Sequence, residues 1–105
     1  MTKSDHIIGL IRQSVTSTAP GATLILYGSY ARSEQNQESD IDILILVDKA
    51  NLSREDVKKI KYPLYDIEFE TGVIISPIVL AKPEWESKHF ITPFYENIKN
   101  EGIIL

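Results

Sequence analysis

The sequence has 105 residues, 43% of them hydrophobic and 25% charged, and a formal net charge of −4. This size and composition predict one globular domain, residues 1–105, with one modest core. The negative charge argues against a nucleic-acid partner, which needs clustered Lys and Arg, and the absence of cysteine excludes disulfides and thiolate metal sites. No signal peptide and no apolar run of membrane-spanning length is seen, so we expect a cytoplasmic protein without membrane contact.

The first elements are expected to be a helix and a strand. Ser4 or Asp5 could cap the helix, whose apolar residues recur at helical spacing until residues 19–21 end it with Pro and Gly. Residues 23–27 are a short apolar run, which is typical of a buried strand.

A second strand follows after a polar interval. Residues 29–33 are expected to begin a brief helix, and residues 34–39 read as a loop. Residues 41–47 are apolar on both faces, which predicts a strand in the centre of a sheet.

A long helix is predicted next. Ser53 and Asp56 have the spacing of a capping box, with Asp as a shorter substitute for Glu or Gln. Pro63 falls inside the apolar stripe and should kink the segment or split it into two helices. Gly72 should end it.

The last third of the chain returns to strand and helix. Residues 73–80 predict a third strand, in which Pro77 indicates an edge position or a break. Residues 82–86 resemble a helical turn, and Thr92 should cap a helix that starts at Pro93 and stops at Gly102. The apolar tail could dock on the sheet. This order predicts a small α/β fold, with a mixed sheet of three to four strands covered by helices.

Residues suited to binding a metal ion or a ligand gather at the two predicted strand ends. Asp40 and Asp42 stand at i and i+2, which point to the same side of a strand. Two carboxylates side by side repel each other unless a cation lies between them. Gly28, which ends the preceding strand, has no Cβ and lets a bulky ligand approach the backbone.

Phosphate-binding groups follow that glycine. Ser29 offers a hydroxyl and a backbone N–H at the start of a helical turn, and Arg32 lies one turn further on. Mg²⁺ takes oxygen ligands from one or two carboxylates together with substrate phosphates. These residues therefore predict a site for a nucleoside triphosphate and Mg²⁺, with the α-phosphorus held for attack.

The pattern Gly28–Ser29, ten intervening residues, then Asp40–Ile41–Asp42 resembles the signature of the polymerase-β-type nucleotidyltransferase superfamily, and most closely its minimal prokaryotic members. In that family the Gly–Ser pair binds the triphosphate and the two aspartates bind the catalytic metals. The resemblance implies these roles for Gly28, Ser29, Asp40 and Asp42, and Arg32 matches the Arg that often follows Gly–Ser there.

One departure from the family pattern concerns a third acid. Active members usually carry a third carboxylate on a later strand, but the matching strand here has only Ser76 as a polar side chain near its middle. Asp66, Glu68 and Glu70 precede that strand on the predicted helix. They could reach the site only if the end of the helix folds over it, and a solvated helix face is the simpler expectation.

The resemblance implies transfer of AMP from ATP to a hydroxyl of another molecule. A free minimal domain resembles antitoxins that adenylylate a tyrosine on small helical ribonuclease toxins, which implies a helical protein partner; a homo-oligomer is also possible. A catalytically impaired nucleotide-binding or docking module and a small-molecule, antibiotic-type nucleotidyltransferase are the alternatives. The aromatic residues Trp85, Phe90, Phe94 and Tyr95 are expected to pack rather than stack on a base.

Overall fold

A computed structural model describes residues 3–28, 40–87 and 92–105. Ser29, Arg32 and the helix and loop predicted at 29–39 lie outside the described residues, as does Phe90. The elements in chain order are α1 (Lys3–Thr18), β1 (Thr23–Tyr27), β2 (Ile41–Val47), α2 (Arg54–Thr71), β3 (Ile75–Ala81), α3 (Lys82–Glu86), α4 (Pro93–Glu101) and β4 (Ile103–Ile104).

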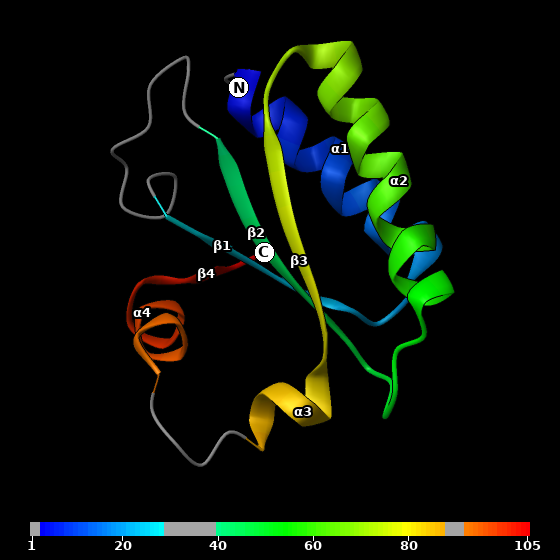
Figure 1. The fold of residues 1–105 in the computed structure, drawn as a ribbon. Helices are drawn as coiled ribbons and strands as arrows, with labels where there is room; N and C mark the ends of the chain where they lie inside the picture. Colours follow the sequence, from blue (N-terminus) through cyan, green and yellow to red (C-terminus); the bar gives the residue numbers. More distant parts are fainter. Residues whose placement is uncertain (1–2, 29–39, 88–91) are drawn as a thin grey trace.

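The four strands form one mixed sheet in the order β3-β2-β1-β4. β1 pairs antiparallel with both β2 and β4, whereas β2 and β3 run parallel. The strand that is apolar on both faces, β2, therefore lies inside the sheet as its sequence predicts. The apolar tail docks through β4 on the far side of β1, which confirms the predicted mixed α/β fold (Figure 1).

β3 lies at the edge of the sheet, as Pro77 predicts. The carbonyl of Ile74 accepts a hydrogen bond from the N–H of Ile41 at 2.9 Å, so the N–H of the same peptide, that of Ile75, points away from β2. Glu68 Oε1 accepts from that N–H at 2.8 Å. Pro77, two residues further on, has no N–H to leave unpaired at this edge.

The two faces of the sheet are covered by different helices. α1 and α2 lie side by side on one face, and α3 and α4 lie on the other (Figure 1). The first face holds the larger core, formed by these buried residues: Ile7, Ile11, Val15, Ala19, Leu24, Leu26, Ile41, Ile43, Ile45, Ile60, Leu64, Ile75 and Val79. The second holds Ile25, Leu44, Leu46, Trp85 and Ile98.

α2 is one continuous helix, so the predicted division at Pro63 is wrong. Ile60 and Leu64, on either side of the proline, are 3% and 0% exposed. Burying two such side chains stabilises the helix by about 3–6 kcal/mol, which offsets the roughly 3 kcal/mol cost of an interior proline. The predicted capping box is present, and Gly72 ends the helix with φ 74°.

The predicted ends of the other helices are mostly confirmed. Thr92 caps α4 by accepting a hydrogen bond from the N–H of Tyr95, and Gly102 follows its last residue in an extended conformation. α1 already includes Lys3, so Ser4 and Asp5 lie in its first turn rather than ahead of it. No helix within the described ranges combines the length and the apolar character that a bilayer crossing requires.

Candidate active site

Asp42 occupies the second position of β2, next to an apolar run that fixes its direction. Its register partners are Tyr27 on β1 and Ser76 on β3. Residues paired across neighbouring strands share a face of the sheet, and side chains alternate along each strand. Leu44, two residues after Asp42, is buried in the core beneath α3 and α4. Asp42 therefore lies on the α3/α4 side, half-buried, near the start of β2.

Gly28 and Asp42 lie against each other. Gly28 follows β1 with φ 73°, a left-handed conformation that glycine adopts without steric cost. A Cβ at this position would collide with Asp42 Oδ2 and would lie 3.3 Å from its Cγ. The carboxylate thus fills the space that a side chain at residue 28 would need. The structure brings together the glycine corner and one of the two predicted metal-binding acids.

Tyr27 forms one wall beside this carboxylate. Partial burial raises the pKa of the Tyr27 hydroxyl above its ordinary value of 10.0, and the negative charge of Asp42 raises it further. The Tyr27 ring meets Phe94 edge to face, with 5.5 Å between the ring centroids. Phe94 in turn packs edge to face on Trp85 at 6.0 Å, and Trp85 lies 4.8 Å from Tyr95.

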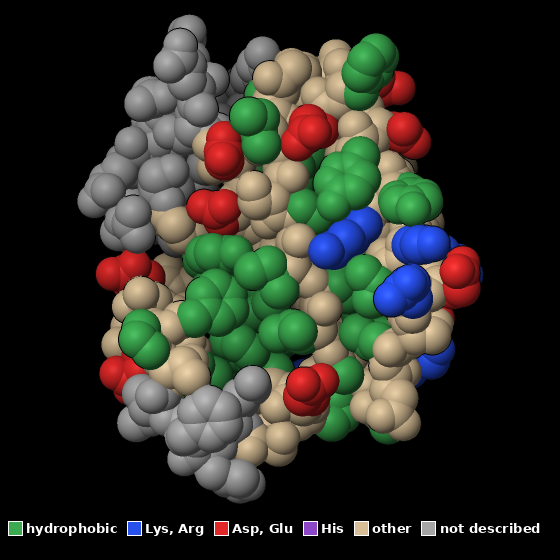
Figure 2. Space-filling view, in the orientation of Figure 1, with side chains coloured by type: hydrophobic (Ala, Val, Ile, Leu, Met, Phe, Trp, Pro, Cys, Tyr) green, Lys and Arg blue, Asp and Glu red, His purple; other side chains and the backbone are tan. Residues whose placement is uncertain are grey.

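These four residues, Tyr27, Trp85, Phe94 and Tyr95, are called the aromatic cluster below. Their mutual packing accords with the packing role expected for Trp85, Phe94 and Tyr95, but sequence reasoning did not connect them with the site. The only sequence signal was that Tyr27 directly precedes Gly28. Phe94 remains 37% exposed. Figure 2 shows hydrophobic side chains gathered between α4 and β3 on this side of the molecule.

Ser76 lies beside Asp42 on the strand that the resemblance expects to carry a third carboxylate. It is the β3 partner of Asp42 in the parallel register and is half-buried. Within residues 3–28, 40–87 and 92–105, no group of three or more His, Cys, Asp or Glu side chains could hold a metal ion. The strand neighbouring Asp42 therefore contributes a hydroxyl rather than a third acid.

The acids of α2 do not supply the missing group. Asp66 and Glu70 are exposed on α2, which covers the opposite face of the sheet from Asp42. Glu68 is bound to the N–H of Ile75, on the side of β3 that faces away from β2. The expectation of a solvated face is met for Asp66 and Glu70, while Glu68 secures the edge strand.

The donor set at the start of β2 suits a hard cation. Asp40 is exposed and immediately precedes β2, Asp42 is held against Gly28, and the Ser76 hydroxyl is carried by the next strand. Carboxylate and hydroxyl oxygens are ligands that Mg²⁺ accepts, and Mg²⁺ commonly keeps several waters or substrate phosphates in its shell. These residues fit a magnesium ion that is bound by few protein groups.

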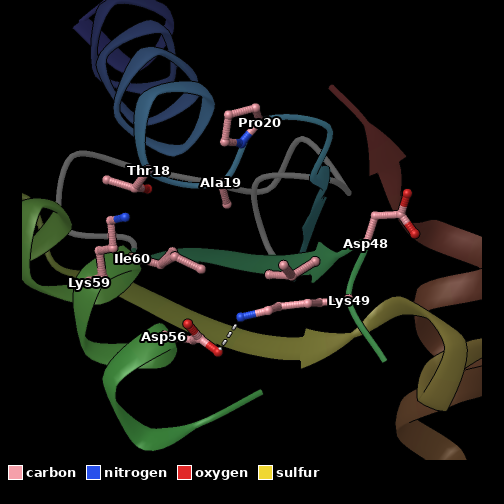
Figure 3. A pocket seen from close by; sticks show the side chains of 9 residues that line it. Thr18, Ala19, Pro20, Asp48, Lys49, Asp56, Lys59 and Ile60 are labelled. Carbon is pink, nitrogen blue, oxygen red and sulfur yellow. Dashed lines mark hydrogen bonds and ion pairs between the residues drawn. The ribbon is translucent and has the colours of Figure 1, made fainter. Parts of the chain in front are cut away.

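A separate hollow lies at the other end of β2. It has a volume of about 250 Å³ and lies between the end of α1, the residues after β2 and the first half of α2 (Figure 3). Lys49 Nζ lies 2.8 Å from Asp56 Oδ2 there, and hydrogen bonds from Lys49 and Ser53 lower the pKa of Asp56 to about 2. Asp56 is thus engaged by the lysine and the helix cap, and none of the predicted site residues lines the hollow.

The fold and the site together define the class of protein. The family model described as "Nucleotidyltransferase domain" matches residues 8–105 of the chain, and the chain therefore belongs to the nucleotidyltransferase domain family. The match includes both segments of the Gly–Ser and Asp-x-Asp signature. The resemblance inferred from the motif is thereby confirmed, together with membership of a class of enzymes that transfer nucleotidyl groups.

Two archaeal proteins of known sequence are similar to most of the chain. The chain is 36% identical over 81 residues to "Putative protein adenylyltransferase MJ0141" of Methanocaldococcus jannaschii, covering 76% of this chain and 74% of that protein. It is 35% identical over 82 residues to "Putative protein adenylyltransferase MJ0604" of the same organism, covering 78% and 75%.

A solved structure shares the fold. A chain from a crystal structure described as a toxin-antitoxin with AMP-PNP superposes with a TM-score of 0.64. The superposition covers 91% of this chain and 69% of that one, at 18% sequence identity. At this identity the likeness bears on the fold, and it confirms the nucleotidyltransferase-like architecture.

Proposed function

We propose that this chain transfers AMP from ATP to a hydroxyl group of a partner protein, with Mg²⁺ bound by Asp40 and Asp42. The observation that supports this most directly is the contact between the Asp42 carboxylate and Gly28, the first residue of the phosphate-binding pair. The names of the two archaeal relatives support a protein as acceptor. The nucleotide analogue and the toxin-antitoxin pairing of the structural neighbour support ATP and a protein partner.

In this reaction the acceptor oxygen bonds to the α-phosphorus, and the bond from that phosphorus to the oxygen leading to the β-phosphate breaks. Pyrophosphate leaves, and the hydroxyl proton is lost to solvent. The metal neutralises the charge of the phosphates when it is bound. Gly28 leaves room for the triphosphate, while Ser29 and Arg32, which lie outside the described residues, are expected to bind it.

The surroundings of Asp42 are suited to a protein acceptor. Phe94 exposes part of its ring within the aromatic cluster, which also includes Tyr27 beside the carboxylate. An apolar surface next to a reactive group gives a partner protein a place to dock. We extend the proposal to one domain spanning residues 1–105 that acts in the cytoplasm.

ATP labelled at the α-phosphate or at the γ-phosphate distinguishes the proposed reaction from phosphoryl transfer. The purified chain is incubated with Mg²⁺ and the protein encoded beside it, or with a panel of other acceptors. We expect the α-label to become attached to the acceptor and the γ-label to leave with pyrophosphate. Transfer of the γ-label, or failure to transfer either label to any acceptor, would contradict the proposal.

Asp42→Asn tests the site with a matched control. Mutation of a residue that hydrogen-bonds to a metal ligand typically lowers metal affinity or activity by roughly 10- to 100-fold. Loss of a ligand itself should therefore reduce transfer by at least about 100-fold. Asp48→Asn changes an exposed acid just past the other end of β2 and should leave transfer unchanged. Equal activity in both variants would exclude Asp42 from the site.

A nucleotide-binding module without turnover is the second candidate. It is favoured by Ser76, which stands next to Asp42 where a third carboxylate is expected. Calorimetry combined with a pyrophosphate assay in the presence of acceptor separates the two candidates, because a module binds Mg·ATP but releases no pyrophosphate. Ser76→Asp would add the acid, and a gain of pyrophosphate release in that variant would identify the native chain as the impaired form.

A further inference from the structure

The outer face of α2 carries large aromatic side chains that no described part of the chain covers. Tyr62, Tyr65 and Phe69 are 57%, 43% and 90% exposed. Their spacing places all three on one side of the helix, away from Ile60 and Leu64, which are buried against the core. Most exposed hydrophobic residues on a protein surface are isolated, but a row of aromatic rings along one helix indicates an interface. We call Tyr62, Tyr65 and Phe69 the α2 stripe.

Charges along α2 are divided between its two halves. The second half contains only acidic charges, Asp66, Glu68 and Glu70, whereas the first half has a net positive charge. The charged residues of the first half are Arg54, Glu55, Asp56, Lys58, Lys59 and Lys61, and Glu55 Oε1 lies 3.9 Å from Lys58 Nζ. Along the right side of Figure 2, where α2 lies, the acidic side chains near the top and the basic side chains lower down have hydrophobic side chains between them, and an acidic side chain also lies beside the basic ones. Two copies of α2 that lie antiparallel therefore place the positive half of each helix beside the negative half of the other.

We propose that the α2 stripe is the interface of a symmetric dimer in which α2 of one copy packs antiparallel on α2 of a second copy. A twofold axis between residues 63 and 64, at the centre of the α2 stripe, brings together positions equally far from it. Tyr62 then meets Tyr65 of the second copy, and Lys58 meets Phe69 of the second copy, over whose ring an ammonium group can bind. Lys59 comes opposite the segment that carries Asp66 and Glu70.

The charge pattern favours a second copy over a different protein. An antiparallel arrangement places each basic half beside an acidic half, whereas a parallel one would place like charges together. The opposed helix dipoles also favour it. An unrelated partner would require neither sign to be separated along the helix in this way.

The size of the helix sets the expected strength of the dimer. An 18-residue helix is about 27 Å long, and two such helices paired along their length bury on the order of 1,000 Å² in total. This area is at the low end for specific interfaces, so the dimer should be weak and dependent on protein concentration. α2 covers the face of the sheet opposite Asp42, so the dimer leaves the candidate active site accessible and is independent of the proposed function.

Sedimentation velocity over a range of concentrations tests the proposal. We expect the native chain to shift from monomer to dimer as its concentration rises, and Tyr65→Ser combined with Phe69→Ser to raise the dimer Kd at least about tenfold. Ile104→Ser is the matched control, because Ile104 is 71% exposed on β4, at the opposite edge of the sheet from β3, against which α2 packs, and should leave the dimer unchanged. Circular dichroism confirms that each variant is folded.

Charge reversal makes the test specific to the antiparallel arrangement. Lys58→Glu with Lys59→Glu, and separately Asp66→Lys with Glu70→Lys, should each abolish the homodimer, and an equal mixture of the two variants should form a heterodimer. A native chain that stays monomeric at all concentrations would overturn the proposal. It would also be overturned by a dimer that survives the stripe and charge variants, or by a stripe that binds only a different protein.

Discussion

The two faces of the sheet are built from the same strands but closed to different degrees. On the α1/α2 face, side chains from both helices and three strands form a continuous apolar core, and residues such as Ile43 and Leu64 are fully buried. On the α3/α4 face, the apolar packing ends at Tyr27, and the polar Asp42 and Ser76 stand in register beside it at the start of β2. We call the α1/α2 face the closed face and the α3/α4 face the open face. Because the closed face supplies most of the buried apolar surface, the open face can carry polar groups at its edge.

The closed face should therefore respond most strongly to the loss of side-chain volume. Leu64→Ala, at a residue that is 0% exposed, should lower the free energy of unfolding by about 2–5 kcal/mol because it leaves a cavity. Leu80→Ala, at a half-buried residue on the α3/α4 side, should cost less. Chemical denaturation of both variants measures the difference, and equal losses would show that the faces do not differ in this way.

The border of the open face can be tested at Gly28. Gly28→Ala and Gly21→Ala both force alanine into a positive φ, 73° and 84°, which costs about 1–2 kcal/mol each. Only at Gly28 does the added Cβ also meet the Asp42 carboxylate, since nothing lies within 4 Å at Gly21. We expect both variants to lose stability but only Gly28→Ala to lose Mg·ATP binding. Equal binding would show that the contact does not matter to the site.

A smaller effect is expected at the cap of α2, the helix that covers the closed face. The Ser53 hydroxyl accepts from the N–H of Asp56, and the Asp56 carboxylate accepts from the N–H of Ser53, each at 3.0 Å. Ser53→Ala should cost about 1 kcal/mol. Thermal unfolding of this variant, with Ser87→Ala at the end of α3 as an exposed control, measures the loss.

Asp56 makes the free energy of unfolding depend on pH. Its pKa falls from 3.8 to about 2 in the folded state, so its contribution to stability is present above pH 4 and is lost as the pH falls from about 4 to about 2. Asp56→Asn should flatten the stability curve within that window alone. A difference in slope confined to neutral pH would contradict this assignment.

The smallest effect is electrostatic and concerns Tyr27. Because burial and Asp42 raise its pKa above 10.0, the unfolded chain ionises first and folded stability declines as the pH rises from about 10 through the folded pKa. Asp42→Asn should move the Tyr27 pKa toward 10.0 but not fully, since burial remains the larger cause. Carbon NMR titration of the tyrosines measures the shift, and Asp48→Asn should not reproduce it.

The sequence by itself determined the order of most elements and the family. The capping box at Ser53, the helix start at Pro93 and the edge position of Pro77 follow from backbone chemistry within a few residues, and all three are confirmed. The Gly–Ser and Asp-x-Asp spacing identified the nucleotidyltransferase domain because it is a local pattern. The metal and nucleotide roles of Gly28, Ser29, Arg32, Asp40 and Asp42 stay predictions.

Only the tertiary structure decided the features that depend on distant contacts. Pro63 did not divide α2, because the apolar residues on both sides of it are buried by elements far away in the chain. The edge of β3 gave Glu68 a backbone N–H to bind, although helical spacing alone could not tell this acid from its exposed neighbours. Register placed Ser76 and Tyr27 beside Asp42, since strand pairing joins residues that no sequence period relates.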